Sequence, residues 1–288
     1  MGPGGRRPAQ TSAAHGSGLR FDPLRYGVIS DIHGNLPALR AALAELRRQG
    51  TDGLLCTGDL IGYGPWPNEC VAEIAAEVAV CVAGNQDLAV VDRLPEARLS
   101  NHARLILEWT RTVLDPDAAA YLGALPLQAS VEPAVRLAHG SIEDPERYIY
   151  RDDDAAQQLK LLGEMDPAAQ TLLLGHTHKA MAYGHRSGVR RLTPRVPMPL
   201  AGDRHLLNPG SIGQSRERNP WARMALLDLE QQQVTFFALD YDLELCRKEL
   251  IRHGLPPGAC HAPPSLVSLG HRSVKRLARR ALRSVRRS

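Results

Sequence analysis

The sequence has few aromatic residues, few cysteines and no long apolar run. Aromatic side chains make up 5% of the 288 residues, so aliphatic side chains must form most of the core. The five cysteines form no CxxC pair, and their odd number favours a reduced cytoplasmic protein over a secreted, disulfide-linked one. No segment is apolar over the roughly 20 residues that a membrane-spanning helix needs, and the first residues lack the apolar run of a signal peptide. We therefore expect a cytoplasmic protein with no transmembrane segment.

Acidic residues are missing from the last eighteen positions, which hold eight lysines and arginines. Without these and the three arginines of the first twenty residues, acidic residues outnumber basic ones, although the formal net charge is +4. The apolar residues of this tail fall on one helical face, which predicts a basic amphipathic helix. Such a helix can bind an anionic membrane surface, nucleic acid or an acidic partner, or pack its apolar face on the body of the protein. Because the tail has no aromatic residue for base stacking, we do not expect it to read a nucleic-acid sequence.

Residues 1–24 are rich in Gly, Ala, Ser and Pro without periodicity, which predicts a disordered leader. Residues 25–255 are expected to form one domain, and residues 256–288 a Pro-containing linker followed by the basic tail. A strand, loop and helix rhythm begins the domain and is typical of an α/β fold. The expected elements are strands at 26–30, 53–57 and 78–83, helices at 36–46 and 68–76, and a helical stretch from 87 onward.

Residues 96–125 look helical and bring no strand, so we expect a helical insertion that could cap a site. The later strands follow one another closely, which indicates hairpins and antiparallel edges. Together these features predict a four-layer αββα sandwich of two mixed β-sheets flanked by helices. The later strands are expected at 134–138, 171–174, 181–185, 188–192, 205–208, 223–229 and 234–238.

Polar residues recur where the predicted strands end, and α/β folds place their sites outside the carboxyl ends of strands. Each place has an ordinary structural explanation, such as a helix cap at Asp31 or a buried structural histidine at His139. The shared pattern of Asp, Asn or His beside a glycine, repeated after five apolar strands, instead indicates a metal site. The candidate ligands are Asp31, His33, Asp59, Asn85, His139, His176 and His178.

These ligand types restrict the metal. Imidazole, carboxylate and amide oxygen without a thiolate suit Mn, Fe, Zn, Ni or Co better than Ca or Cu(I), and we favour Mn. Seven ligands need two divalent ions to use them. Two ions about 3.5–4 Å apart can clamp a phosphoryl group and lower the pKa of a bound water toward about 7.

The ordered set Asp31-x-His33, Gly58-Asp59, Gly84-Asn85, His139-Gly140 and Gly175-His176-x-His178 resembles the motif set of the calcineurin-like metallophosphoesterases. The resemblance spans roughly residues 25–240. It implies that Asp31, His33 and His178 hold one metal, that Asn85, His139 and His176 hold the other, and that Asp59 bridges the two. The segments 62–65 and 208–214 further resemble the small bacterial phosphodiesterase branch.

One position departs from the family pattern, because many members have a histidine where this chain has Gln86. That histidine is usually assigned to leaving-group protonation or to phosphate binding. Glutamine can donate a hydrogen bond to a phosphoryl oxygen, but it cannot deliver a proton near neutral pH. We therefore expect a preference for good leaving groups, or an acid supplied by His102 of the helical insertion or by a metal-ordered water.

Arg216 follows the Asn-Pro-Gly-Ser segment and is a candidate clamp for a substrate phosphate, because a guanidinium matches phosphate oxygens. A solvated surface arginine is the alternative. The leading interpretation of the whole sequence is a phosphodiesterase that cleaves a small or nucleotide-like diester with a metal-bridging hydroxide. Phosphomonoesterase or protein phosphatase activity is an alternative, and a non-catalytic scaffold or sensor of the same fold is another. The sequence does not predict the oligomeric state.

Overall fold

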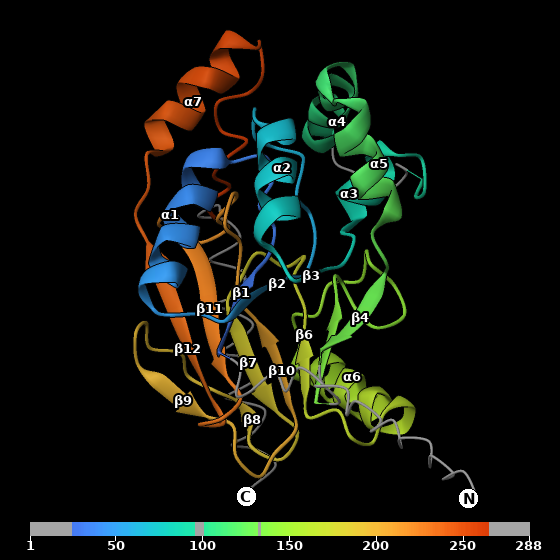
Figure 1. The fold of residues 1–288 in the computed structure, drawn as a ribbon, viewed down its shortest axis with the longest axis vertical. Helices are drawn as coiled ribbons and strands as arrows, with labels where there is room; N and C mark the ends of the chain where they lie inside the picture. Colours follow the sequence, from blue (N-terminus) through green and yellow to red (C-terminus); the bar gives the residue numbers. More distant parts are fainter. Residues whose placement is uncertain (1–24, 96–100, 132–133, 265–288) are drawn as a thin grey trace, which may run out of the picture.

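The computed structural model describes residues 25–95, 101–131 and 134–264. Two six-stranded sheets lie face to face, and helices cover their outer faces (Figure 1). The expected leader at 1–24 and the basic part of the tail at 265–288 lie outside the described residues.

The first sheet combines a parallel half with an antiparallel half. β1, β2 and β3 run parallel, as expected from the strand, loop and helix rhythm, and β11 pairs antiparallel with β1. β11 and β12 form a long hairpin, and β9 adds to its edge. The order across the sheet is β3 (Val80–Cys81), β2 (Gly53–Cys56), β1 (Arg25–Ile29), β11 (Ala222–Asp228), β12 (Gln233–Leu239) and β9 (Pro197–Pro199).

The second sheet is mixed in the same way. β5, β6 and β10 run parallel, while β4 and β7 pair antiparallel with them and β8 pairs antiparallel with β7. The two mixed sheets that the sequence predicts are therefore confirmed. The order is β4 (Gln128–Val131), β5 (Val135–Ala138), β6 (Thr171–Leu173), β10 (His205–Asn208), β7 (Met181–Gly184) and β8 (Gly188–Val189).

Three apolar layers hold the sandwich together. Between the sheets, side chains such as Leu55 and Leu227 meet Leu173 and Leu207 of the opposite sheet. On the outer face of the first sheet, α1 (Leu36–Arg48) buries one apolar face against the strands, and α2 (Pro67–Glu77) packs beside it. On the outer face of the second sheet, α6 (Asp152–Met165) does the same. The result is the predicted four-layer αββα arrangement.

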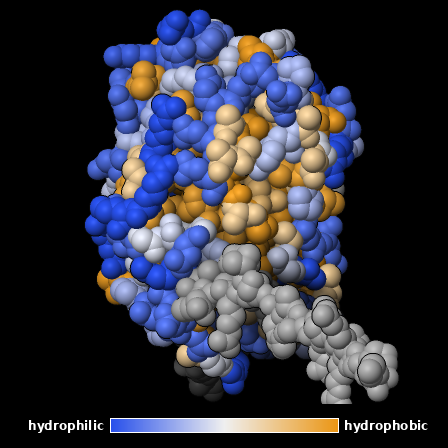
Figure 2. Space-filling view, viewed as in Figure 1, coloured by the Kyte–Doolittle hydropathy of each residue, from blue (hydrophilic) through white to orange (hydrophobic). Residues whose placement is uncertain are grey.

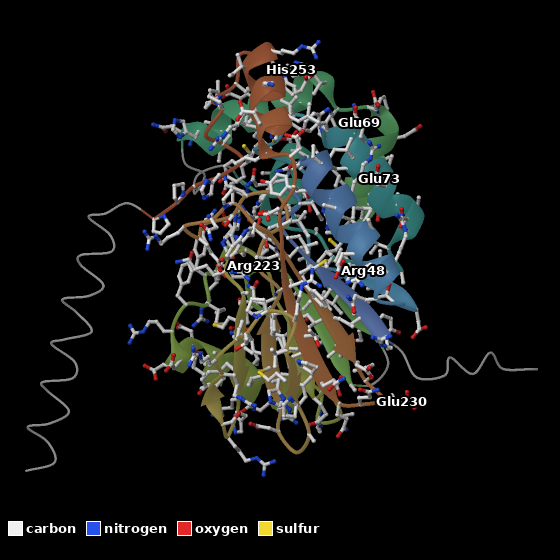
Figure 3. The ribbon with its side chains drawn as sticks, turned by 90° about the vertical axis from the view of Figure 1, so that its left-hand side faces the viewer. Arg48, Glu69, Glu73, Arg223, Glu230 and His253 are labelled. Carbon is white, nitrogen blue, oxygen red and sulfur yellow. The ribbon has the colours of Figure 1, made fainter. Side chains whose placement is uncertain are left out.

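The helical stretch expected at 96–125 contains two helices, α4 (Asn101–Val113) and α5 (Pro116–Ala124), while residues 96–100 are not among the described ones. They follow the short α3 (Asn85–Val90), which begins at a candidate ligand. α4 also packs against α7 (Leu243–Arg252), because Ile106 shares a buried cluster with Cys246 and Leu250. His253, at the upper end of Figure 3, contacts Trp109 of α4 with the two rings tilted by 50° and their centroids 5.0 Å apart.

Four elements were not expected from the sequence: α6, α7, β4 and β9. α6 buries only four of its fourteen residues, so its apolar stripe is narrow, and three aspartates at its start favour the helix through its dipole. β9 contains Pro197 and Pro199, which weakens any strand signal, but it is an edge strand, where proline is tolerated.

The surface seen in Figure 2 is polar over most of its area, and apolar residues gather near its centre, where Figure 1 places the edge strands β3 and β4. Within the described part of the chain, no helix combines the length and the apolar character needed to cross a lipid bilayer. The five cysteines are free and buried.

Candidate metal centre

The seven candidate ligands lie together at one end of the sandwich. They follow β1, β2, β3, β5 and β6, whose carboxyl ends meet at that end because the strands run parallel within each sheet. Figure 3 shows Arg223 near the start of β11 and Glu230 in the turn beyond its end, and β11 runs antiparallel to β1. The candidate site lies toward the Arg223 end.

One group of ligand atoms comes from Asp31, His33 and His178. All three side chains are buried, and one ligand atom from each lies within 4.8 Å of the other two. Asp31 Oδ1 is 3.3 Å from His178 Nε2 and 3.8 Å from His33 Nε2. The three atoms thus surround one point.

A second buried group comes from Asp59, His139 and His176, again within 4.8 Å of one another. Asp59 Oδ2 lies 3.4 Å from His139 Nε2. The same oxygen lies 3.8 Å from His33 Nε2, which belongs to the first group. Asp59 therefore stands between the two groups, where one carboxylate can serve two cations.

Hydrogen bonds fix which ring nitrogen each histidine presents. The Nδ1 atoms of His33, His139 and His178 lie 2.6–3.0 Å from the carbonyl oxygens of Ile61, Thr57 and Gln214. A carbonyl can only accept, so each Nδ1 carries the proton and each Nε2 presents a lone pair. His176 is turned the other way: its Nε2 donates to Glu146 O at 3.0 Å, which leaves Nδ1 as its ligand atom.

Several buried acceptors at this place have no donor. The Nε2 atoms of His33 and His178 are 3.0 Å apart, yet neither has a proton to give the other. His139 Nε2 and Asn85 Oδ1 are buried without a hydrogen-bond partner among the described residues. Unpaired buried acceptors are costly, and bound cations would satisfy them. The residues present therefore fit a dinuclear metal centre.

The backbone at the site is strained. Six non-glycine residues there have φ between +51° and +63°, a conformation that side chains with a Cβ rarely adopt. Such strain persists only where the surrounding structure imposes it, and it concentrates at functional sites. The six are Asp31, His33, Asp59, Tyr63, His176 and His178.

Asp87 holds two of the ligand loops together. Its buried carboxylate accepts hydrogen bonds from the backbone N–H groups of Asp59 and Gly84 at 2.8 and 2.9 Å, and from those of Leu60 and Ile61 at 2.8 and 3.3 Å. The loops can approach so closely because Gly84 has no side chain: a Cβ there would collide with Asp59. The sequence predicts only a helical stretch from residue 87 onward and indicates no role for Asp87.

Burial sets the protonation of the imidazoles. It lowers the pKa of His33 to about 4 and that of His176 to about 3, and it brings the pKa of His178 well below its usual value. These rings are therefore neutral near pH 7, as metal ligands must be.

His139 and Asp59 influence each other. Burial acts to lower the pKa of His139, but the neighbouring Asp59 carboxylate raises it to about 10. Burial acts to raise the pKa of Asp59, but the His139 charge holds it below its usual range. Without a cation, a second proton on His139 Nε2 makes the pair an imidazolium with a carboxylate, and the neutral ring with a free Nε2 lone pair is the form that binds metal.

A cavity of about 360 Å³ opens over the ligands and brings in further side chains. Arg216, the candidate phosphate clamp, lines it together with Asp59 and Asn85. Gln86 lines it too and is 3% exposed, with its Oε1 unpaired.

Two residues of this cavity were missed by the sequence analysis, Glu146 and Tyr148. The Tyr148 ring stacks on His176 at 3.9 Å between centroids, and its hydroxyl lies 3.4 Å from Arg216 Nη1. They lie in a loop without a motif, so only their proximity in the folded chain reveals them.

His102 is placed differently from the other candidates. Its side chain is exposed at the start of α4 and lines a neighbouring hollow rather than the cavity over the ligands. Its assignment as the leaving-group acid stays a prediction.

A larger cavity of about 440 Å³ opens at the other end of the sheets, near Asp228 and Gln232. Asp203 in its wall accepts four hydrogen bonds from residues 186–187 and 204, so it serves the local loop. Among the described residues, the two groups of possible metal ligands are both at the opposite end. The metal chemistry therefore belongs to the smaller cavity.

Comparisons with known proteins agree with this geometry. The family model described as calcineurin-like phosphoesterase matches residues 24–205, and the chain belongs to this family. A solved metallophosphoesterase from Sphaerobacter thermophilus is similar, with 29% identity, a TM-score of 0.72, and coverage of 83% of this chain and 97% of that one.

Two archaeal proteins are similar as well. An uncharacterized protein of Methanocaldococcus jannaschii is 26% identical over 232 residues, which is 80% of this chain and 93% of that protein. A hypothetical protein from Pyrococcus horikoshii has the same fold, with 21% identity, a TM-score of 0.66, and coverage of 82% of this chain and 96% of that one.

Proposed function

We propose that the protein is a dinuclear metal-dependent phosphodiesterase that hydrolyses a small or nucleotide-like phosphodiester. Membership of the calcineurin-like phosphoesterase family supports hydrolysis of a phosphate ester. The observation that carries the proposal is the position of Asp59 between two groups of buried ligands, on the wall of a cavity that also contains Arg216.

Each ligand has a role in this proposal. Asp31, His33 and His178 hold one ion, and Asp59 serves both. When bound, the ions neutralise phosphoryl charge and lower the pKa of water toward about 7. The second ion is held by Asn85, His139 and His176.

Two cavity residues contact the substrate in this account. Arg216 orients the phosphate through the planar fork of its guanidinium, whose hydrogen-bond partners among the described residues include the uncharged Gln214 and Tyr148. Gln86 donates a hydrogen bond from its amide to a phosphoryl oxygen but delivers no proton. His102, or an ordered water, supplies the proton to poor leaving groups.

Imidazole and oxygen ligands support Mn as the metal, with Fe, Zn, Ni or Co as alternatives. The free, buried cysteines support the proposed cytoplasmic location. The partners expected for the basic tail stay predictions, because the tail lies outside the described residues.

Preference for a diester rests on the segments 62–65 and 208–214, which resemble the bacterial diesterase branch. Gln86 restricts the leaving group of either class of ester and does not separate the two. Phosphomonoesterase or protein phosphatase activity is the alternative. A non-catalytic scaffold is less well supported, because all seven ligand positions are filled and converge.

The test compares aryl phosphate diesters with aryl phosphate monoesters on metal-stripped protein reloaded with Mn. The proposal expects a higher kcat/KM for the diester. A higher value for the monoester would replace the diesterase assignment with the monoesterase one. Protein that binds no metal and hydrolyses neither substrate would support the scaffold.

A further inference from the structure

A second hollow, of about 330 Å³, adjoins the metal cavity. The two share Tyr63 and Arg216, so the guanidinium stands at the boundary between them. The volume is at the lower end of the range for small-molecule pockets, about 300–1,000 Å³, which suits one organic group rather than a large ligand. Beyond the shared residues, its wall includes His102 of α4, Pro256, Gly258 and Ala262.

The wall of the hollow is held in place by the chain that follows α7. Ala262 N donates to Ser215 O at 3.0 Å, and Gln214 Nε2 donates to Ala259 O at 2.6 Å. Cys260 is fully buried in a cluster with residues of α4 and α7. Residues 256–262, expected to begin a linker, thus dock against the loop that carries Arg216, and the hollow is preformed.

The chemistry of the wall indicates what can bind there. Among the described residues that line the hollow, none is acidic, and Pro256, Ala259 and Ala262 offer apolar surface beside the Tyr63 ring. Gln214 is already committed to Ala259, so the other polar side chains of the wall are His102 and the shared Tyr63 and Arg216. Without a carboxylate the wall does not suit a cation, and its apolar part suits an uncharged organic group beside the phosphate that Arg216 holds.

We propose that this hollow binds one ester group of a phosphodiester, an uncharged planar organic group of about the size of one nucleoside, while the phosphoryl group lies over the metal ligands. This rests on the proposed function and adds its substrate class. Arg216 holds the phosphate where the two spaces meet. The group in the hollow is the one that stays on phosphorus after cleavage, so a diester that retains a nucleoside fills both spaces, whereas a diester that retains only a methyl group leaves the hollow empty.

Gly258 is the position in the wall at which larger side chains can be tested. A Cβ added there meets no atom within 4 Å and the residue needs no left-handed backbone, so a side chain built at Gly258 begins in open space at the wall of the hollow. Gly123 of α5 has the same freedom and lines neither space, which makes Gly123→Phe the matched control. A graded series from Gly258→Ala through Gly258→Leu to Gly258→Phe tests whether the effect grows with the size of the added side chain, as filling of the hollow requires and misfolding does not.

The substrates are the para-nitrophenyl diester of thymidine 5′-phosphate and methyl para-nitrophenyl phosphate. In both, water adds to phosphorus and the bond to para-nitrophenolate breaks, leaving thymidine 5′-phosphate or methyl phosphate. We expect the wild type to favour the thymidine diester. Gly258→Phe should lower the ratio of the two kcat/KM values about tenfold, mainly through the KM of the thymidine diester. The ratio should fall stepwise along the series and stay unchanged in Gly123→Phe.

The outcomes separate this inference from the proposed function. An active wild type whose ratio does not change in Gly258→Phe, or changes equally in Gly123→Phe, overturns the inference and leaves the phosphodiesterase assignment intact. A metal-loaded wild type that hydrolyses neither diester overturns both.

Discussion

His33 and His178 lie 145 positions apart in the sequence, yet their Nε2 atoms face each other at 3.0 Å, and neither nitrogen carries a proton. Two acceptors at this distance repel each other unless a cation lies against both. The two nitrogens are therefore placed as ligands of one cation, and we expect metal binding to stabilise the fold.

Removal of metal is the first test of that relationship. Stripping the protein with a chelator should lower the unfolding temperature, and Mn should restore it in a concentration-dependent way. A His178→Ala variant should show a smaller shift, because the first group then loses a ligand. Equal unfolding temperatures with and without metal would contradict the relationship.

Asp87 is expected to position the ligand loops without touching the substrate. Asp87→Ala removes the acceptor of four backbone N–H groups, so the free energy of unfolding should fall by about 1–3 kcal/mol. Metal affinity should fall as well, because the Asp59 loop loses its support. Asp117→Ala, at an exposed position of α5, is the control. Denaturant unfolding measures the first effect and Mn titration the second. If stability fell while metal affinity stayed unchanged, Asp87 would stabilise the fold without positioning the metal ligands.

Arg216 is expected to act through the geometry of its guanidinium. Arg216→Ala should lower kcat/KM about 10- to 100-fold, and Arg216→Lys should recover only part of the loss, because an ammonium lacks the planar fork. Steady-state kinetics on a phosphodiester provide the measurement. Unchanged KM and kcat in Arg216→Ala would remove this residue from the site.

Gln86 is expected to limit turnover of poor leaving groups. Gln86→His introduces a side chain that can deliver a proton near neutral pH, so kcat should rise for an alkyl leaving group and change little for para-nitrophenolate. The dependence of rate on leaving-group pKa is the readout. If the rates of the wild type and Gln86→His depended on leaving-group pKa in the same way, residue 86 would not limit turnover of poor leaving groups.

Glu45 links stability to pH away from the site. Hydrogen bonds from Arg48, opposed by burial and aided by Gln49 and Arg195, lower the pKa of Glu45 to about 2. Its folded pKa lies below the unfolded one, so its contribution to stability is present above about pH 4.5 and disappears as the pH falls toward 2.

The comparison is between the wild type and Glu45→Gln. The difference in their unfolding temperatures should shrink as the pH falls from about 4.5 to about 2. Glu230→Gln, at the exposed β11–β12 turn in Figure 3, should show no such trend. If the wild type still unfolded at a higher temperature than Glu45→Gln by the same margin at pH 2, the ionised Glu45 carboxylate would not be the cause of the difference.

The candidate ligands could be predicted because each follows a strand directly, so local sequence fixes its place at the sheet edge. The two-sheet fold could be predicted from the sequence for the same reason. Tyr148 and Glu146 could not be predicted, because they reach the cavity through a loop whose path depends on tertiary packing. The hollow that His102 lines could not be predicted, because it depends on how α4 packs against α7. The docking of residues 256–262 could not be predicted, because two prolines and a glycine at 256–258 are typical of a linker.

Metal counting on an Asp59 variant tests the central claim most directly. The account predicts about two Mn ions per wild-type chain by elemental analysis after reconstitution. Asp59→Asn should bind fewer ions and lose at least about 100-fold in activity, because one carboxylate serves both ligand groups. Two ions bound with full activity in Asp59→Asn, or no ion bound by the wild type, would contradict it.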